Sequence, residues 1–491
     1  MKILFITSEA LPFAKTGGLA DVSAAIPAGL ADLGHEVKVV MPKYGIIDDQ
    51  EAHLQPTKQS VRVSLGPMGT TTIHFWESTL PKTNVKVYLL DNELFDRKGL
   101  YQENGKDYED NDVRFILLSK GSIGFCGVTS WKPDVIHLND WQTALVPLFL
   151  REKVGTKVFP EERPATVLTI HNIAYQGIFP QETLAIAELG MQAFTMQRLE
   201  FFGKINFLKG GIIYSDVIST VSPTHAEEIQ SAKFGFKLDG VIRERKEKLV
   251  GILHGIDERT WNPETDRFLA AKYSAEDLSG KKDCKRQLQE ICGFESRPDT
   301  PLLGIVSRLA SQKGIDLLIA ALPALSSFKV QLVILGTGHQ TYHRKLLELE
   351  QRFGHLFRTF LTFNERLAHQ IQAGSDIFLI PSKYEPGGLT QMISLKYGTV
   401  PVARKTGGLA DTIEDYSFSL QKGTGFLFDF YSPDSLIRAI DRAIHLYKCD
   451  RAAWQRLMKN GMGLSFSWRK SAENWENVYR RALTAIKGQF E

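Results

Sequence analysis

The stretch Lys15-Thr16-Gly17-Gly18-Leu19-Ala20-Asp21 occurs twice in this chain. The second copy is Lys405-Thr406-Gly407-Gly408-Leu409-Ala410-Asp411, and all seven residues are identical. In each copy the glycine pair precedes a segment with helical spacing, so its backbone N–H groups are expected at a helix N-terminus, where they favour an anion such as phosphate. A single copy also fits a tight turn with close packing. Two copies favour two similar halves that share one anionic ligand in a cleft.

The residues around the first copy alternate between an apolar strand and an amphipathic helix. Lys2 to Thr7 is predicted as a buried strand. Apolar residues then recur every three or four positions from Leu19 to Leu33, which predicts one helix face that ends at Gly34. Pro27 lies within this segment and predicts a kink or two short helices. Further strands are predicted at Val37 to Met41, Val85 to Leu89, Val135 to Leu138, Val167 to Ile170 and Val217 to Thr220.

A second series of strands begins after the polar stretch Asp257 to Pro263. Its members are predicted at Leu302 to Val306, Leu332 to Leu335, Phe360 to Phe363 and Ile377 to Ile380. Short apolar strands that alternate with helical segments are typical of a parallel sheet wrapped by helices. The fold class is therefore α/β, with two Rossmann-like, doubly wound domains that face a cleft.

Composition excludes several classes of protein. The 491 residues carry 59 Lys+Arg and 56 Asp+Glu, a formal charge of +3, which gives no field suited to a nucleic-acid partner. No apolar stretch approaches the ~20 residues of a membrane span, and the N-terminal apolar run is too short for a signal peptide. The four cysteines form no C-x-x-C pair, so neither a disulfide framework nor a metal site is expected. We expect a cytoplasmic protein without a membrane partner.

The first Rossmann function to test is dinucleotide binding. Gly336-Thr337-Gly338 follows a predicted strand, but the G-x-G-x-x-G fingerprint needs a glycine at the position of Thr341. No Walker motif replaces it. The sequence therefore predicts neither a nicotinamide cofactor nor a P-loop.

Charged residues follow two strands of the second series. Arg308 and Lys313 come after the strand that ends at Val306, where two cations would neutralise a diphosphate leaving group. A solvated loop with ordinary surface charges is the alternative. Glu385 lies between Tyr384 and Pro-Gly-Gly after a later strand, which suits a carboxylate that binds sugar hydroxyls.

Two loops in the first half add polar candidates. They are His137-Leu138-Asn139-Asp140-Trp141 and His171-Asn172-Ile173-Ala174-Tyr175-Gln176-Gly177. A histidine after a strand is more often structural than catalytic, and Asp140 also fits a helix cap.

The combination of these motifs resembles the family of bacterial glycogen synthases and plant starch synthases. The motifs that carry the resemblance are K-T-G-G-L-A-D at 15 to 21, H-N-I-A-Y-Q-G at 171 to 177, S-R-L-x-x-x-K-G at 307 to 314, E-P-G-G-L-T-Q at 385 to 391 and T-G-G-L-A-D at 406 to 411. They occur in order and span almost the whole chain.

This resemblance implies a retaining glucosyltransferase of the glycosyltransferase-B fold. Such enzymes move glucose from ADP-glucose to the 4-hydroxyl at the non-reducing end of an α-1,4-glucan such as glycogen, release ADP, and need neither metal nor cofactor. The implied domains are an N-terminal, acceptor-side domain at 1–252, a C-terminal, donor-binding domain at 253–470, and a helix at 471–491 that crosses back to the first domain.

The resemblance also implies which residues form the site. The catalytic set would be Glu385, His171, Asp140, Arg308 and Lys313. The substrate-binding set would be Lys15, Gly17, Gly18, Asp21, Phe363, Tyr384, Gly387, Gly388, Leu389, Thr406, Gly407 and Gly408. Lys15 and the Gly17-Gly18 turn would contact the donor phosphates and glucose, and Thr406, Gly407 and Gly408 the distal phosphate. Arg308 and Lys313 would stabilise the departing ADP. Glu385 would hold the glucose hydroxyls, and His171 and Asp140 would contact the transferred glucose.

Three positions depart from the family pattern. Gly387 stands where many bacterial members have cysteine, Phe363 where tyrosine is common in the segment that stacks on adenine, and Asn139 where histidine is frequent. None of these removes a charge that the mechanism needs. Two alternatives stay open: a UDP-glucose-dependent relative such as a sucrose-phosphate or trehalose-phosphate synthase, and a catalytically silent glucan-binding protein.

Overall fold

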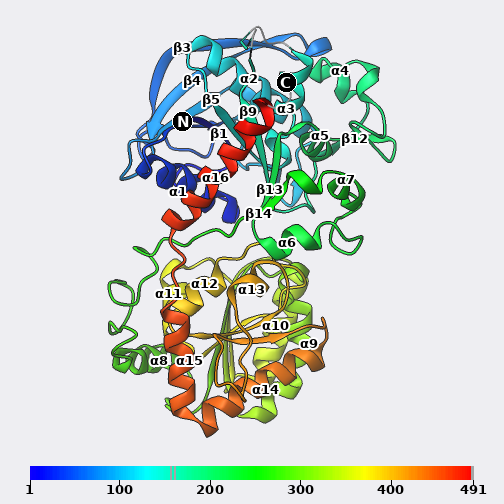
Figure 1. The fold of residues 1–491 in the computed structure, drawn as a ribbon. Helices are drawn as coiled ribbons and strands as arrows, with labels where there is room; N and C mark the ends of the chain where they lie inside the picture. The colour runs from blue at the N-terminus through cyan, green and yellow to red at the C-terminus, as the bar shows by residue number, and fades with distance from the viewer. Residues whose placement is uncertain (155–157, 160–161, 488–491) are drawn as a thin grey trace. The chain divides into compact units, whose positions relative to one another are not determined.

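The computed structural model describes residues 1–154, 158–159 and 162–487, and the chain divides into two compact units. Unit 1 takes in Met1–Leu253 and the C-terminal segment from Trp468, and unit 2 is His254–Ser467. The sequence predicts these divisions at 252 and 470. Figure 1 shows the elements of each unit.

Unit 1 is built on a nine-stranded sheet with the order β14-β13-β9-β8-β1-β2-β5-β4-β3. Its parallel strands are β1 (Lys2–Ile6), β2 (Glu36–Pro42), β5 (Lys86–Asp91), β8 (Val135–Asn139), β9 (Ala165–Ile170), β13 (Val217–Thr220) and β14 (Leu249–Gly251). An antiparallel pair, β3 (Gln55–Ser64) and β4 (Thr70–Thr79), extends one edge. Two small sheets are formed by β10 (Ile178–Phe179), β12 (Lys204–Asn206) and β11 (Glu200–Phe201), and by β6 (Gln102–Glu103) and β7 (Lys106–Asp107).

The sheet of unit 1 is accompanied by eight α-helices in the described residues. They are α1 (Gly18–Asp32), α2 (Asn111–Val128), α3 (Val146–Glu152), α4 (Thr183–Ala187), α5 (Phe207–Tyr214), α6 (Pro223–Glu228), α7 (Asp239–Glu244) and α16 (Trp468–Lys487). Helix α1 runs without interruption through Pro27, so the predicted alternative of two short helices is wrong. The chain leaves α1 at Gly34, whose φ of 87° suits glycine, as the sequence predicts.

Helix α16 completes the core of unit 1, although it comes from the far end of the chain (Figure 1). Its Trp475 and Tyr479 are fully buried, and the Tyr479 hydroxyl lies 2.7 Å from Nδ1 of His137 on β8. His137 is therefore a core residue of the sheet, as the structural alternative for a histidine in a strand predicts. At Gly29 of α1 an added Cβ would lie 2.9 Å from the Ala472 Cβ, so the two helices approach closely.

Unit 2 is built on a fully parallel sheet with the order β17-β16-β15-β18-β19-β20. The strands are β15 (Leu302–Val306), β16 (Gln331–Leu335), β17 (Phe357–Phe360), β18 (Ile377–Ile380), β19 (Val400–Arg404) and β20 (Phe426–Phe428). The helices are α8 (Ser279–Ile291), α9 (Ile315–Leu325), α10 (Gln340–Phe353), α11 (Glu365–Gly374), α12 (Thr390–Lys396), α13 (Gly407–Thr412), α14 (Pro433–Cys449) and α15 (Arg451–Met462).

The third strand of unit 2 corrects a prediction. The sequence places it at Phe360 to Phe363, whereas β17 covers Phe357–Phe360. β17 pairs with β16 up to Phe360, and Asn364 then caps α11 by accepting a hydrogen bond from the Leu367 N–H. The three residues between strand and cap therefore form a connection, and the side chain of Phe363 is exposed.

Both large sheets have the strand order of a doubly wound fold. If the parallel strands of each are numbered along the chain, both contain the order 3-2-1-4-5-6. The direction of winding reverses between β1 and β8 in unit 1, and between β15 and β18 in unit 2. These two switch points are where open α/β sheets bind ligands, at the carboxyl ends of the strands. The predicted class of two Rossmann-like domains is confirmed.

Candidate active site

The predicted site residues cluster at the two switch points. In unit 1, the Lys15–Asp21 copy follows β1 and Asp140 follows β8, while His171 follows the next strand, β9. In unit 2, Arg308 and Lys313 follow β15 and Glu385 follows β18, while the second copy follows β19. Each unit therefore carries part of the predicted residue set at the carboxyl ends of its own strands.

The first glycine turn is held by a buried carboxylate that the sequence analysis missed. Glu9 is only 3% exposed and accepts hydrogen bonds from the Thr16 N–H (2.6 Å), the Thr16 hydroxyl (2.6 Å) and the Gly17 N–H (3.3 Å). The hydroxyl of Tyr101 donates a fourth (2.7 Å). Burial and the Glu9 charge raise the pKa of Tyr101 well above its usual value, so Tyr101 stays a donor. The sequence feature that could have revealed Glu9 is the polar run Thr7-Ser8-Glu9, which directly follows β1.

The charged side chains and the glycines of the first copy are at least partly exposed, whereas Ala20 is buried. Lys15 pairs with Asp21 at 2.9 Å, and both side chains are partly exposed. α1 begins at Gly18, and a Cβ added at Gly17 or Gly18 would meet no atom within 4 Å. Packing therefore does not require these two glycines, and the tight-packing alternative does not account for them.

The loop after β8 is strained. Asp140 has φ 56° and ψ −170°, a conformation that costs of order 1–3 kcal/mol in a residue other than glycine. Its Oδ1 accepts hydrogen bonds from the backbone N–H groups of His171 (2.7 Å) and Asn172 (3.4 Å), which ties the loops after β8 and β9 together. Removal from water raises the pKa of Asp140 to about 7, despite the two N–H donors. Asp140 does not cap a helix with its side chain.

In unit 2 the predicted carboxylate and one predicted cation are in direct contact. The Lys313 ammonium lies 2.8 and 2.7 Å from the two oxygens of Glu385, which also accepts a hydrogen bond from the Ser382 hydroxyl (2.8 Å). Glu385 is 6% exposed. Gly314 allows this contact, because at φ 72° a Cβ would lie 2.0 Å from the Pro381 carbonyl oxygen. The pair places opposite charges side by side at the switch point of unit 2.

The second glycine turn is packed against the loop that carries Glu385. A Cβ at Gly407, whose φ is 45°, would lie 2.0 Å from the Glu385 carbonyl oxygen, and one at Gly408 would lie 1.8 Å from that of Gly387. The Gly408 N–H donates to the carbonyl groups of Glu385 and Pro386. Here close packing does require the glycines, so the two copies differ in what surrounds them.

The other predicted residues of unit 2 differ in their exposure. Thr406 is buried, Tyr384 and Leu389 are half-buried, and Gly388 has φ 71°. Arg308, which follows the same strand as Lys313, is exposed, and Phe363, in the connection after β17, is 83% exposed. A ring so open to water is available for stacking.

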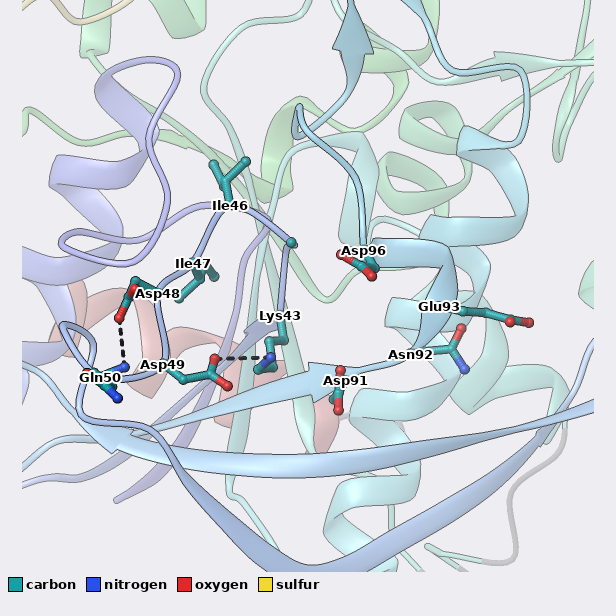
Figure 2. Close-up of a pocket in the computed structure, with 11 residues that line it drawn as sticks. Lys43, Ile46, Ile47, Asp48, Asp49, Gln50, Asp91, Asn92, Glu93 and Asp96 are labelled. Atoms are coloured by element: carbon teal, nitrogen blue, oxygen red, sulfur yellow. Dashed lines mark hydrogen bonds and ion pairs between the residues drawn. The ribbon is translucent and has the colours of Figure 1, made fainter.

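A cavity of about 760 Å³ in unit 1 lies apart from these motifs (Figure 2). Its lining includes Lys43, which pairs with Asp49 at 3.1 Å, and the carboxylates Asp48, Asp49, Asp91, Glu93 and Asp96. Five acidic groups against one cation disfavour a diphosphate. None of the predicted site residues lines it, so we base the candidate site on the switch points.

The described part of the chain offers neither a cluster of metal ligands nor a helix that could span a membrane. There, no group of three or more His, Cys, Asp or Glu side chains is arranged to hold a metal ion. Within the same residues, no helix combines the length and the apolar character that crossing a membrane demands.

Two family models match the chain and fit this architecture. The starch synthase catalytic domain matches residues 2–244, and glycosyl transferases group 1 matches residues 291–459. With two doubly wound sheets, these matches define a glycosyltransferase. A glycogen synthase from Geotalea daltonii is 44% identical over the full length of both chains, and one from Syntrophotalea carbinolica is 44% identical over 98% of this chain and 99% of its own. The chain belongs to the glycogen synthase and starch synthase family.

Solved structures agree with this assignment. The catalytic domain of starch synthase IV from Arabidopsis thaliana, bound to ADP and acarbose, superposes with a TM-score of 0.90 at 33% identity, covering 98% of this chain and 99% of its own. Sucrose-phosphate synthase from Thermosynechococcus elongatus matches with a TM-score of 0.62 at 17% identity, over 99% of both chains. The second likeness concerns the fold alone.

Proposed function

We propose that the protein transfers glucose, with retention of configuration, from ADP-glucose to the non-reducing-end 4-hydroxyl of an α-1,4-glucan and releases ADP. The observation that carries the proposal is the Lys313–Glu385 pair at the switch point of unit 2, with Arg308 on the same loop as Lys313. The starch synthase IV structure, which holds ADP and acarbose, supports the same substrate classes. We place the reaction in the cytoplasm, without a metal or cofactor.

The charges of unit 2 suit this chemistry. Glycosyl transfer from a diphosphate passes through an oxocarbenium-like state while negative charge grows on the leaving ADP. The Lys313 and Arg308 cations stabilise that charge, and the Glu385 carboxylate binds the glucose hydroxyls. Lys313 contacts Glu385 directly. The same ammonium therefore adjoins the carboxylate that would bind the sugar and is one of the two cations that would bind the phosphates. We assign no residue as a nucleophile and propose attack by the acceptor on the face that ADP leaves.

The groups of unit 1 are proposed to act on the donor glucose and its phosphates. Lys15 would exchange its Asp21 partner for a donor phosphate, which a partly exposed ion pair permits at small cost. Asp140 and His171 would contact the transferred glucose. Thr406, Gly407 and Gly408 of unit 2 would cradle the distal phosphate, while the Gly408 N–H stays bonded to the loop that carries Glu385.

A donor-competition assay tests the proposal. With glycogen present, labelled glucose should enter the polymer from ADP-glucose much faster than from UDP-glucose. Transfer from UDP-glucose to a small sugar-phosphate acceptor, with none to glycogen, would favour the sucrose-phosphate or trehalose-phosphate synthase alternative. No transfer from either donor to either acceptor would favour a silent glucan-binding protein. Boiled enzyme and glycogen-free reactions are the controls.

Thiol alkylation gives a second test of the site. Cys126, Cys284 and Cys292 are buried, and burial raises the pKa of the Cys126 and Cys292 thiols to about 12, so these groups stay unreactive. Cys449 is exposed but lies in none of the motifs. Iodoacetamide should therefore leave glucose transfer intact.

The matched variant is Gly387→Cys, which puts a thiol beside Glu385. Its untreated activity is measured first, because Gly387 packs against Gly408. Alkylation should then inactivate the variant, and ADP-glucose should protect it. If the variant is active and alkylation does not affect it, residue 387 does not line the donor site.

A further inference from the structure

Asn139 makes two side-chain hydrogen bonds at the end of β8. The residue is fully buried, its Nδ2 donates to the Ile6 carbonyl of β1 at 2.9 Å, and its Oδ1 lies 2.9 Å from Nε2 of His171. The backbone of Asn139 is fixed as well, because Thr143 Oγ1 accepts from its N–H at 2.7 Å. One amide therefore links β1, β8 and the loop after β9.

The Ile6 carbonyl determines which way this amide faces. A carbonyl oxygen only accepts, so the NH₂ group of Asn139 must point to Ile6. The flipped amide would oppose two oxygens across β1 and β8, which is repulsive. The oxygen of Asn139 is therefore the atom that faces His171.

An oxygen that faces a ring nitrogen in turn determines where the ring carries its proton. Amide oxygen only accepts, so Nε2 of His171 must be protonated to make the 2.9 Å contact. In a neutral imidazole only one nitrogen carries hydrogen, which leaves Nδ1 as the acceptor nitrogen. The backbone N–H of His171 donates to Asp140 at 2.7 Å, so the main chain and the ring of His171 are held by different residues.

We propose that Asn139 is a positioning residue that locks neutral His171 in the Nε2–H tautomer. Its catalytic consequence rests on the proposed function, in which His171 contacts the transferred glucose. In that tautomer a substrate hydroxyl that meets Nδ1 must donate to it.

Nitrogen NMR of the unmodified full chain reads the tautomer directly. With ¹⁵N-labelled histidine at pH 8, where an ordinary histidine is neutral, two-bond ¹H–¹⁵N spectra separate protonated from unprotonated ring nitrogens. The signals of His171 are those absent from the His171→Gln variant. We expect a protonated Nε2 and an unprotonated Nδ1. A protonated Nδ1, with or without a protonated Nε2, overturns the proposal.

The paired variants are Asn139→Leu and Thr143→Val. The leucine keeps the volume but loses both amide hydrogen bonds, so His171 should populate both tautomers and kcat with ADP-glucose should fall about 10- to 100-fold, with KM little changed. Thr143→Val removes a buried hydrogen bond to the backbone N–H of Asn139 and leaves the Asn139 amide in place. The tautomer of His171 should therefore be the same as in the parent. An unchanged tautomer and kcat in Asn139→Leu contradict the proposal. A parent protein without glucose transfer would contradict the proposed function instead, and the spectrum would still report the tautomer.

Discussion

Replacing Glu385 with alanine should lower kcat for glucose transfer at least ~100-fold, about 2.7 kcal/mol of lost transition-state stabilisation. The carboxylate is buried, and its contacts to Lys313 and Ser382 fix its position. The variant would lose both the proposed hydrogen bonds to the sugar and the contact that aligns the Lys313 ammonium. ADP affinity should change little, because Lys313 remains and is released to the phosphates.

Two further variants separate charge from scaffolding at this position. Glu385→Gln keeps the shape and removes the charge that holds Lys313, so it should lose most of the same activity. Ser382→Ala removes one hydrogen bond to the carboxylate and leaves the ion pair, so it should cost far less. Steady-state kinetics with ADP-glucose and glycogen measure kcat, and ADP titration measures affinity. A Glu385→Ala enzyme with the parent kcat would exclude Glu385 from the site.

Alanine at Gly408 should disable the protein, whereas alanine at the equivalent Gly18 should leave its stability unchanged. The Cβ at 408 would lie 1.8 Å from the Gly387 carbonyl oxygen and 2.6 Å from its carbon, so the loop with Glu385 must shift. We expect a loss of about 2 kcal/mol in unfolding free energy, seen as a Tm lower by about 4–8 °C, and more than ~100-fold lower kcat.

The control uses the other copy of the same seven residues. At Gly18 an added Cβ meets no atom within 4 Å, and alanine is the better helix former at the first position of α1. The Tm of Gly18→Ala should therefore stay within about 1 °C of the parent value or rise slightly. Thermal scans of both variants test this contrast. Equal losses of Tm in the two variants would mean that the packing around the copies does not differ as described.

The strands that the sequence predicts well are those buried on both faces. Short apolar runs mark β1, β8, β15 and β18 in the sequence. A strand that is buried on both faces of a parallel sheet has a nearly continuous apolar sequence, so it is easy to recognise. β3 was missed because most of its residues are exposed and polar, so its pattern resembles a loop. β19 was missed because Val400-Pro401-Val402 contains a proline, although Pro401 pairs with Phe378 inside the sheet.

The site was predictable as a set of residues but not as a set of contacts. Sequence patterns place Lys313 and Glu385 after different strands, and only the pairing of β15 with β18 brings them within 2.8 Å. Glu9 and Tyr101 were missed for a related reason. They lie far apart in the sequence and outside any motif, and their importance comes from the hydrogen bonds that Thr16 and Tyr101 both donate to Glu9.

The Glu9 carboxylate also limits how far the first heptad could keep its conformation if it were transferred to another protein. In unit 1 the turn rests on one side chain, so a graft of residues 15 to 21 onto another scaffold must include a buried acid at the position of Glu9. In unit 2 the turn rests on main-chain carbonyl groups, so a graft of residues 405 to 411 must carry the whole neighbouring loop. Exchanging the two heptads would leave the sequence unchanged, because they are identical. The difference between the two turns therefore lies entirely in the residues that surround them.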